Sequence, residues 1–195
     1  LAPTLYWEEC RNQAEQFYVL ISTLTKEQLF TRRPAIHLFR SADERALFQR
    51  KLESPSFGQL VRQLETDDLP ANWVTPWGGF EMPAAAQLQV TRYLDVTRRR
   101  LLESDSLLQE EFYPDRDVQL DADVVRLPRW RVTAKNLIFC QGWTPRLPMG
   151  FEKIRFQPAK GEILTLKLPE LQEQRSVHAG CWRARGSGDD YLLGS

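Results

Sequence analysis

An apolar run that ends at a glycine is the feature of this sequence with the most chemical content. Residues 136–140 read NLIFC and are followed by Gln141, Gly142 and Trp143. Because glycine has no Cβ, a strand that ends at one can present bare backbone to a ligand. We therefore expect Gly142 to mark a close approach between the chain and a bound molecule.

Two more segments with informative spacing follow this glycine-tryptophan turn. Residues 158–166 read PAKGEILTL, which predicts a strand with Lys160 and Gly161 near its start. Residues 181–185 read CWRAR, and a short glycine-rich hairpin connects them to YLLGS at 191–195. One apolar strand that ends in glycine has little specificity by itself. The three segments in this order form a more specific pattern.

The three segments resemble the D-amino acid oxidase and glycine oxidase family of FAD-dependent oxidoreductases. In that family an apolar strand ending in a glycine close to a tryptophan returns from the substrate domain to the flavin. A strand with Lys-Gly or Arg-Gly two residues after a proline comes next. The last residues of the chain are similar to a third family pattern, Tyr-Ile-x-Pro-Arg followed by a strand that ends in Gly-x-Thr. The resemblance covers most of the chain and is most specific from residue 77 onward.

The resemblance implies a set of residues that line a flavin. By position, Gly142 and Trp143 would line the FAD, and Lys160 and Gly161 would support the same edge. The segment 134–145 would be a strand that returns to the FAD-binding part of the protein.

The resemblance also implies residues for a substrate. Trp182 stands where the family has its active-site tyrosine, on a strand over the flavin ring, and Arg185 matches the family arginine. A tyrosine offers a hydroxyl to the substrate carboxylate, whereas an indole offers one N–H donor and more bulk. Ala184 replaces the family proline. A flat apolar wall over the substrate is therefore expected, with the preference for amino acids left open; a core aromatic beside Cys181 is the alternative for Trp182.

The chemistry implied by the resemblance is hydride transfer to flavin N5 from a substrate carbon that bears an amine or hydroxyl. The cofactor performs the hard step while the protein positions the carbon, so no catalytic side chain stands out. The expected function is the substrate-binding portion of an FAD-dependent oxidoreductase for a small amine, amino acid or hydroxy acid. The alternatives are a non-enzymatic α+β binding or scaffold domain, and a flavin-fold protein that has lost oxidation.

The glycine fingerprint G-x-G-x-x-G, which seats the flavin pyrophosphate on a helix N-terminus in such enzymes, does not occur in this sequence. We expect the chain to be the middle part of a longer protein, inactive alone, whose partner is the missing FAD-binding part. The apolar strand at 136–140 would then be exposed on one side, and self-association through it is expected.

Composition limits the class of protein. The 195 residues are 42% hydrophobic and 27% charged, as is usual for a globular domain, and a single domain over 1–195 is expected. The 26 basic and 26 acidic residues cancel, so no long-range attraction for nucleic acid or an anionic membrane is expected. No apolar run approaches the roughly 18 residues of a membrane span.

Metal-binding and nucleophilic residue types are sparse. Cys10, Cys140 and Cys181 are far apart and form no C-x-x-C, which favours buried or idle thiols in a reducing cytoplasm over a disulfide or zinc site. His37 and His178 are the two histidines, and a structural or solvent-facing role is favoured over a catalytic one. The aspartates at 115, 117, 121 and 123 lack the glycine and glutamate of a calcium loop, and solvent-facing strand carboxylates are favoured.

Helical spacing dominates the first half of the sequence and strand patterns the second. Apolar steps of three and four predict helices over 4–24 and 90–104, and the Ser41 to Glu44 capping box starts another. Because the strands are too close together for helical crossovers, we expect an α+β fold: a mainly antiparallel twisted sheet with helices packed on one face. The expected strands are 30–40, 107–112, 118–127, 130–132, 136–140, 163–168 and the segment around Trp182, and a short helix is expected after Pro55 with Phe57, Leu60, Val61 and Leu64 on one face. The apolar stripes are Cys10, Ala14, Phe17, Ile21 and Leu24 on the first helix, and Val90, Leu94, Thr97 and Leu101 on the later one.

Overall fold

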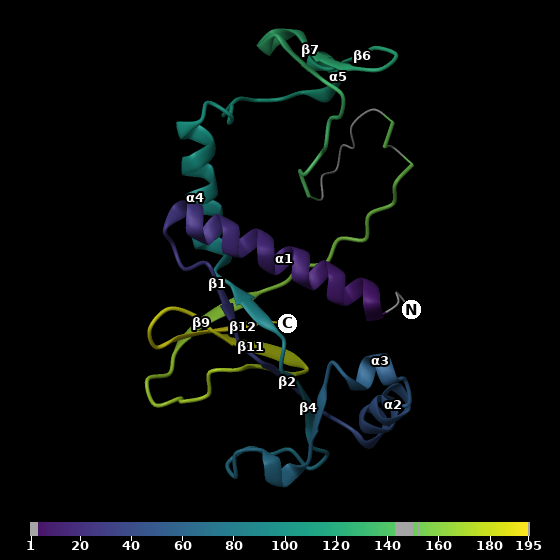
Figure 1. The fold of residues 1–195 in the computed structure, drawn as a ribbon, viewed down its shortest axis with the longest axis vertical. Coiled ribbons are helices and arrows are strands. Elements are labelled where there is room, and N and C mark those ends of the chain that lie inside the picture. Colours follow the sequence, from purple (N-terminus) through teal and green to yellow (C-terminus); the bar gives the residue numbers. More distant parts are fainter. Residues whose placement is uncertain (1–3, 143–149, 152, 195) are drawn as a thin grey trace. The chain divides into compact units, whose positions relative to one another are not determined.

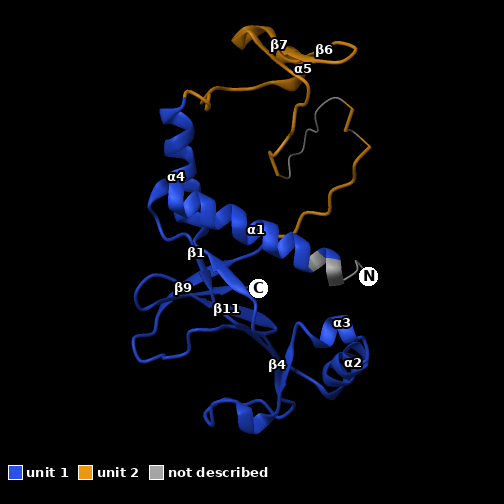
Figure 2. Ribbon diagram, viewed as in Figure 1, with its two compact units in different colours: residues 1–104, 161–195 blue, residues 105–160 orange. Residues whose placement is uncertain are grey.

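The computed structural model describes residues 4–142, 150–151 and 153–194. It divides the chain into two compact units (Figure 2), one built from residues 1–104 and 161–195 and the other from residues 105–160. The first unit therefore joins two distant parts of the sequence. The expectation of a single domain remains a prediction.

A seven-stranded sheet organises the first unit (Figure 1). Its strands in spatial order are β3 (Arg62–Leu64), β4 (Gly79–Met82), β2 (Ala35–Leu38), β10 (Ser176–Ala179), β11 (Cys181–Arg185), β12 (Asp190–Gly194) and β9 (Ile163–Lys167). Every neighbouring pair is antiparallel except β2 with β10, which run parallel. The expected α+β fold with a mainly antiparallel sheet is confirmed, and the predicted strands at 163–168 and around Trp182 both lie in this sheet.

The helices of the first unit come from the first half of the chain, as predicted. They are α1 (Thr4–Thr25), α2 (Ala42–Leu52), α3 (Pro55–Gly58) and α4 (Val90–Glu103), with a 3-10 turn at Thr66–Asp68. The Ser41 side chain accepts a hydrogen bond from the backbone N–H of Glu44 at 3.2 Å. The Glu44 carboxylate reaches back to the backbone N–H of Arg40 at 2.7 Å, so the capping prediction for α2 is confirmed.

Contacts among four phenylalanines hold α2 and α3 against one face of the sheet. The ring of Phe48 stacks on Phe80 of β4 with centroids 4.7 Å apart, and it also contacts Phe39 and Phe57. Phe48 and Phe39 are buried. Burial of rings of this size supplies much of the energy that holds a helix to a sheet.

The opposite face of the sheet is covered by loops rather than helices. Ile36 and Leu64 are almost fully buried there, and they form a core with Leu69. Trp73, which lies in the loop between β3 and β4, packs against this core. This loop therefore covers part of the sheet.

The predicted strand at 30–40 is in fact two strands in different sheets. β1 (Phe30–Arg32) pairs with β5 (Ala86–Leu88) in a separate two-stranded ribbon, and β2 begins only at Ala35. Pro34 lies at the break and has no backbone N–H to donate to a sheet. The hydrophobic alternation continues across the break, which is why the sequence pattern did not reveal it.

The predicted apolar stripes of the two long helices are wrong. On α1 Phe17 and Leu24 are largely exposed, and Tyr18 faces inward instead, with its ring 5.9 Å from Phe30 and 5.4 Å from Tyr93 of α4. On α4 Val90, Leu94 and Leu101 are exposed and Val96 is buried. Aromatic contacts between the helices and β1 decide the buried side. The face predicted at 57–64 is also wrong, because α3 ends at Gly58 and β3 follows.

The second unit is small and mostly irregular. It holds α5 (Pro114–Asp117), a 3-10 turn at Pro128–Trp130, and a three-stranded sheet of β6 (Gln119–Leu120), β7 (Val125–Leu127) and β8 (Val132–Ala134). Asp117 is buried, and its charge is compensated there: its carboxylate accepts from the backbone N–H of Tyr113 at 2.9 Å and pairs with Arg116. The Arg116 hydrogen bond is the main reason that the pKa of Asp117 is lowered. The prediction of a solvent-facing strand carboxylate is therefore wrong for Asp117.

The predicted strands at 107–112 and 136–140 are absent from the described structure, where both segments are irregular. A strand needs a hydrogen-bonded neighbour, and none of the described residues pairs with either segment. Ile138 is 79% exposed, as expected for a poorly covered segment, but Phe139 packs on Phe112 and Phe151. Cys10, Cys140 and Cys181 are exposed free thiols, so of the two alternatives expected for them, burial does not hold. No helix in the described ranges is both long and apolar enough to cross a membrane.

The phenylalanine cluster predicts a large contribution of Phe48 on α2 to the free energy of unfolding. Replacing Phe48 by alanine should lower the free energy of unfolding by about 3–5 kcal/mol, because a buried ring is lost and a cavity remains. Leu47→Ala on the same helix is the matched control, since Leu47 is 45% exposed, and it should cost under about 1 kcal/mol. Urea unfolding measures both values; equal costs would show that α2 is not held through Phe48.

Candidate functional site

Trp182 lies in a row of side chains that crosses the large sheet. In strand register it is opposite His178 of β10 and Gly194 of β12, and His178 is in turn opposite His37 of β2. Residues opposite each other on neighbouring strands point to the same face. We call this surface the His37 face; it also carries Phe80, whose ring stacks on His37 at 5.1 Å.

Gly194 is required by the position of the Trp182 indole. A Cβ built on Gly194 would lie 2.5 Å from Cζ2 and 2.6 Å from Cε2 of Trp182, far inside contact distance. The indole therefore lies flat across the neighbouring strand, and only a glycine leaves room for it. Trp182 is half-buried, so part of the residue remains accessible.

The two histidines of the chain are neighbours on this face, although 141 positions of sequence separate their numbers. The His37 Nε2 atom lies 3.4 Å from Oε1 of Glu44 on α2. The hydrogen bond from the Arg40 backbone lowers the pKa of Glu44, and His37 lowers it further. Burial lowers the pKa of His178, with a second contribution from the charge of His37. His178 is therefore held in its neutral form around pH 7.

Arg185 does not share the face of Trp182. The two residues are three positions apart on β11, and side chains that far apart along a strand point to opposite faces. The Arg185 guanidinium lies over the ring of Tyr191 at 5.8 Å and donates to the Gly188 carbonyl at 3.0 Å, while its backbone carbonyl accepts from Gln87. These contacts tie the last hairpin to β5.

Gly142 lies in the second unit, at an apolar hollow of about 370 Å³. Its φ of +65° is a conformation that favours glycine, and, apart from its chain neighbours, no described residue has an atom within 4 Å of a Cβ added there. Trp143 lies outside the described residues. The hollow is lined by Leu137, Ile138, Phe139, Gln141, Gly142, Phe151, Ile154 and Phe156.

This lining fits one part of a flavin. Bare backbone at Gly142 and apolar side chains around it suit a flat aromatic ring, but the lining holds no cation for a pyrophosphate. Neither Lys160 nor Gly161 is among the lining residues; both are exposed, Lys160 at the end of the second unit and Gly161 where the chain re-enters the first. The role of these two residues at the flavin therefore remains a prediction.

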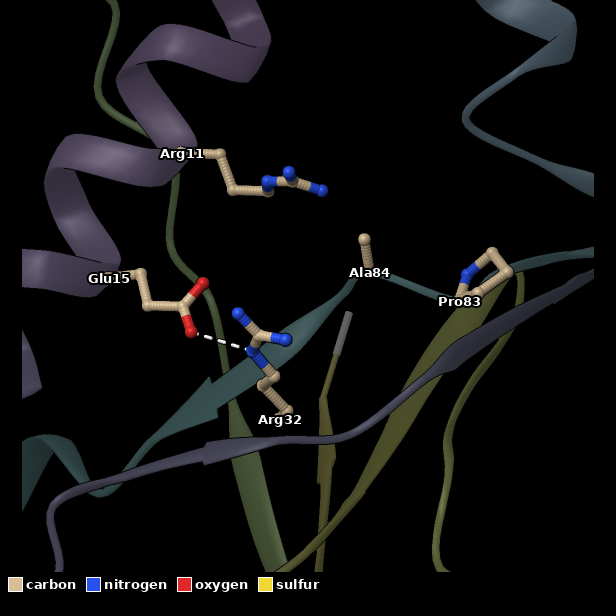
Figure 3. Close-up of a pocket in the computed structure, with 5 residues that line it drawn as sticks. All are labelled: Arg11, Glu15, Arg32, Pro83 and Ala84. Atoms are coloured by element: carbon tan, nitrogen blue, oxygen red, sulfur yellow. Dashed lines mark hydrogen bonds and ion pairs between the residues drawn. The ribbon is translucent and has the colours of Figure 1, made fainter.

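A charged hollow of about 260 Å³ lies between α1, β1 and the turn after β4 (Figure 3). Glu15 and Arg32 form an ion pair of 2.6 Å across it, and Arg11 points into it from α1. The Glu15 hydrogen bond raises the pKa of Arg32, whose side chain is 77% exposed. Exposed ion pairs of this kind contribute little energy, so we assign this hollow no catalytic role. Nowhere in the described part of the chain do three or more His, Cys, Asp or Glu side chains gather as a metal site would need.

The sequence did not reveal the pairing of the histidines. Each lies in a short apolar segment, and no local pattern indicates that β2 and β10 are parallel neighbours. The Trp182 assignment did come from the sequence, because its motif is local. Its separation from Arg185 could have been found there too, since strand alternation alone places the two on opposite faces.

The fold is similar to that of the crystal structure of glycine oxidase from Geobacillus kaustophilus. The TM-score is 0.74 at 18% sequence identity, and the match covers 99% of this chain and 55% of that one. The chain thus spans about half the length of that protein. No protein-family model matches the sequence, and no curated protein matches it either. At this identity the likeness establishes the α+β fold.

The contact between Trp182 and Gly194 predicts that substitutions at the two positions have non-additive effects on stability. Gly194→Ala should destabilise the protein by about 1–3 kcal/mol, because the new methyl group overlaps a packed indole. In a Trp182→Ala background the same change should cost much less, a coupling that a double-mutant cycle measures. Gly58→Ala is the control, since a Cβ there has its nearest neighbour at 3.8 Å. Additive effects of the two substitutions would contradict the close approach.

Proposed function

We propose that this chain is the substrate-binding portion of an FAD-dependent oxidoreductase, which oxidises a small amine, amino acid or hydroxy acid by hydride transfer to the flavin. The observation that carries the proposal is the likeness to glycine oxidase over 99% of the chain at a TM-score of 0.74. The three sequence segments that resemble this family add independent support.

In this proposal the chain binds and orients the substrate, and the flavin, when bound, supplies the hydride acceptor. Trp182 forms the apolar wall against which the substrate carbon lies. Gly142 presents its backbone to the flat ring of the flavin, with Trp143, Lys160 and Gly161 near the same cofactor. Arg185 supports the site through Tyr191 and the last hairpin, since it lies on the opposite face from Trp182.

The remaining parts of the proposal concern the context of the chain. FAD-binding segments of the same protein are its partner, the exposed residues around Ile138 are covered by them or by self-association, and the protein works in the cytoplasm. Catalysis is expected only where those segments hold the flavin.

The decisive experiment is purification of the protein from its full reading frame. A flavoprotein should be yellow, and glycine or another small amine or hydroxy acid should bleach the flavin without oxygen. A colourless protein favours a non-enzymatic binding domain. A yellow protein that none of these compounds reduces favours a flavin fold without oxidation.

The positive φ of Gly142 allows a test of the cofactor site with a matched control. Gly142→Ala should lower flavin affinity at least tenfold, about 1.4 kcal/mol, because the added methyl group would point into the space proposed for the flavin and meets no other described residue within 4 Å. Gly188→Ala is the matched control, since Gly188 has a φ of +59° and equally open surroundings, so it carries the same backbone strain. The measurement is flavin absorbance per protein after purification. Equal flavin content in the two variants would refute the assignment of Gly142.

Trp182 should matter for the substrate and not for the cofactor. Trp182→Ala should keep its flavin and slow flavin reduction by substrate at least tenfold, because the wall that orients the substrate carbon is removed. Trp182→Tyr keeps an aromatic wall and should retain most of the rate. Trp77→Ala, at a tryptophan that is 39% exposed in a loop, is the control. Stopped-flow reduction without oxygen gives the rates; loss of flavin from Trp182→Ala would contradict the assignment.

A further inference from the structure

His178 and Trp182 are neighbours in strand register on the His37 face. They are direct partners across β10 and β11, an arrangement that places Cβ atoms about 4.5–5.5 Å apart. Both side chains are half-buried, so each keeps an accessible part. A small molecule that lies on this face between β10 and β11 can therefore contact both side chains.

Charged and titratable side chains lie near His178 on the neighbouring elements. His37 faces it from β2, Glu44 of α2 lies behind His37, and the Arg40 side chain packs against the turn at Gly180. The next residue of the row on β12 is Gly194, which carries no charge. Burial and His37 both lower the pKa of His178, so one imidazole nitrogen is free to accept a proton at neutral pH.

A neutral proton acceptor beside the substrate matters more for a hydroxyl substrate than for an amine substrate. An ammonium group can lose its extra proton to solvent before the reaction, and the nitrogen lone pair of the resulting free amine then helps to expel the hydride. A hydroxyl oxygen does this poorly until its proton is removed, so oxidation of an alcohol gains from a general base. A base beside the substrate wall therefore favours a hydroxyl substrate.

We propose that His178 is the general base for a small hydroxy acid or alcohol, with His37 as its charged neighbour on β2. The assignment rests on the proposed function and narrows its substrate class. The substrate C–H bond breaks and its electron pair leaves as hydride to the flavin. The O–H bond breaks as its proton passes to the imidazole, and a carbonyl group forms from the same carbon and oxygen.

The first test compares substrates on the flavin-loaded protein. Glycolate and lactate should reduce the flavin at least tenfold faster than glycine and D-alanine. His178→Gln keeps a hydrogen-bond acceptor that cannot hold a proton, and it should slow reduction by the hydroxy acids at least 100-fold. Ser176→Ala, on the same strand and face, is the control and should reduce at the wild-type rate.

The second test needs no flavin. The chain has two histidines, so NMR titration of their ring protons, assigned with His37→Gln and His178→Gln, follows each one separately. The pKa of His178 should lie below the usual value of about 6.5, and His37→Gln should raise it by removing a neighbouring charge. Because the protonated imidazole cannot accept a proton, hydroxy-acid reduction should fall as pH drops through the same pKa, and His37→Gln should move that fall to higher pH.

The outcomes separate the two proposals. A flavoprotein that glycine reduces faster than glycolate and lactate, or a His178→Gln variant as fast as wild type, overturns the role of His178 and leaves the proposed function standing. A His178 pKa at or above 6.5 also overturns it. A protein without flavin overturns the proposed function, and the role of His178 with it.

Discussion

The parallel pairing of β2 with β10 is the contact on which the rest of the first unit depends. Strands β3, β4 and β2 come from residues 35–82, and β10, β11, β12 and β9 come from residues 163–194. Among the described strands, this pair alone joins the two groups into one sheet. Closing so long a loop costs chain entropy, and burial of Ile36 opposite Val177 at the junction helps to offset it.

The same pairing assembles the candidate site. Its register sets His37 opposite His178, and the β10–β11 hairpin carries the row on to Trp182 and Gly194. A slip of one residue between β2 and β10 would turn His178 to the other face and away from His37. The two features proposed to act on a substrate, a flat apolar wall and a neutral imidazole, thus depend on one register.

The two faces of the sheet have different chemistry. Opposite the His37 face, Glu81 is buried and accepts from Arg62 at 2.8 Å and from Arg175 at 3.2 Å. Arg175 also pairs with Glu173 at 2.6 Å, and this bond is the main reason that the pKa of Glu173 is lowered. Buried charges need such partners. Arg185 belongs to this charged face. On the His37 face, the next two residues of the row after His178 are Trp182 and Gly194, and neither carries a charge.

The sequence by itself determined whatever rests on neighbours along the chain. The helix bounds of α1 and α4, the Ser41 cap, the α+β class and the place of Trp182 on a strand all follow from periodicity, capping chemistry or a local motif. The tertiary structure decided the rest. The buried side of α1, the break at Pro34, the missing partner of residues 136–140 and the meeting of His37 with His178 depend on which distant segments pack together. Periodicity cannot supply that information, because burial and strand pairing are properties of two segments and a sequence pattern describes one.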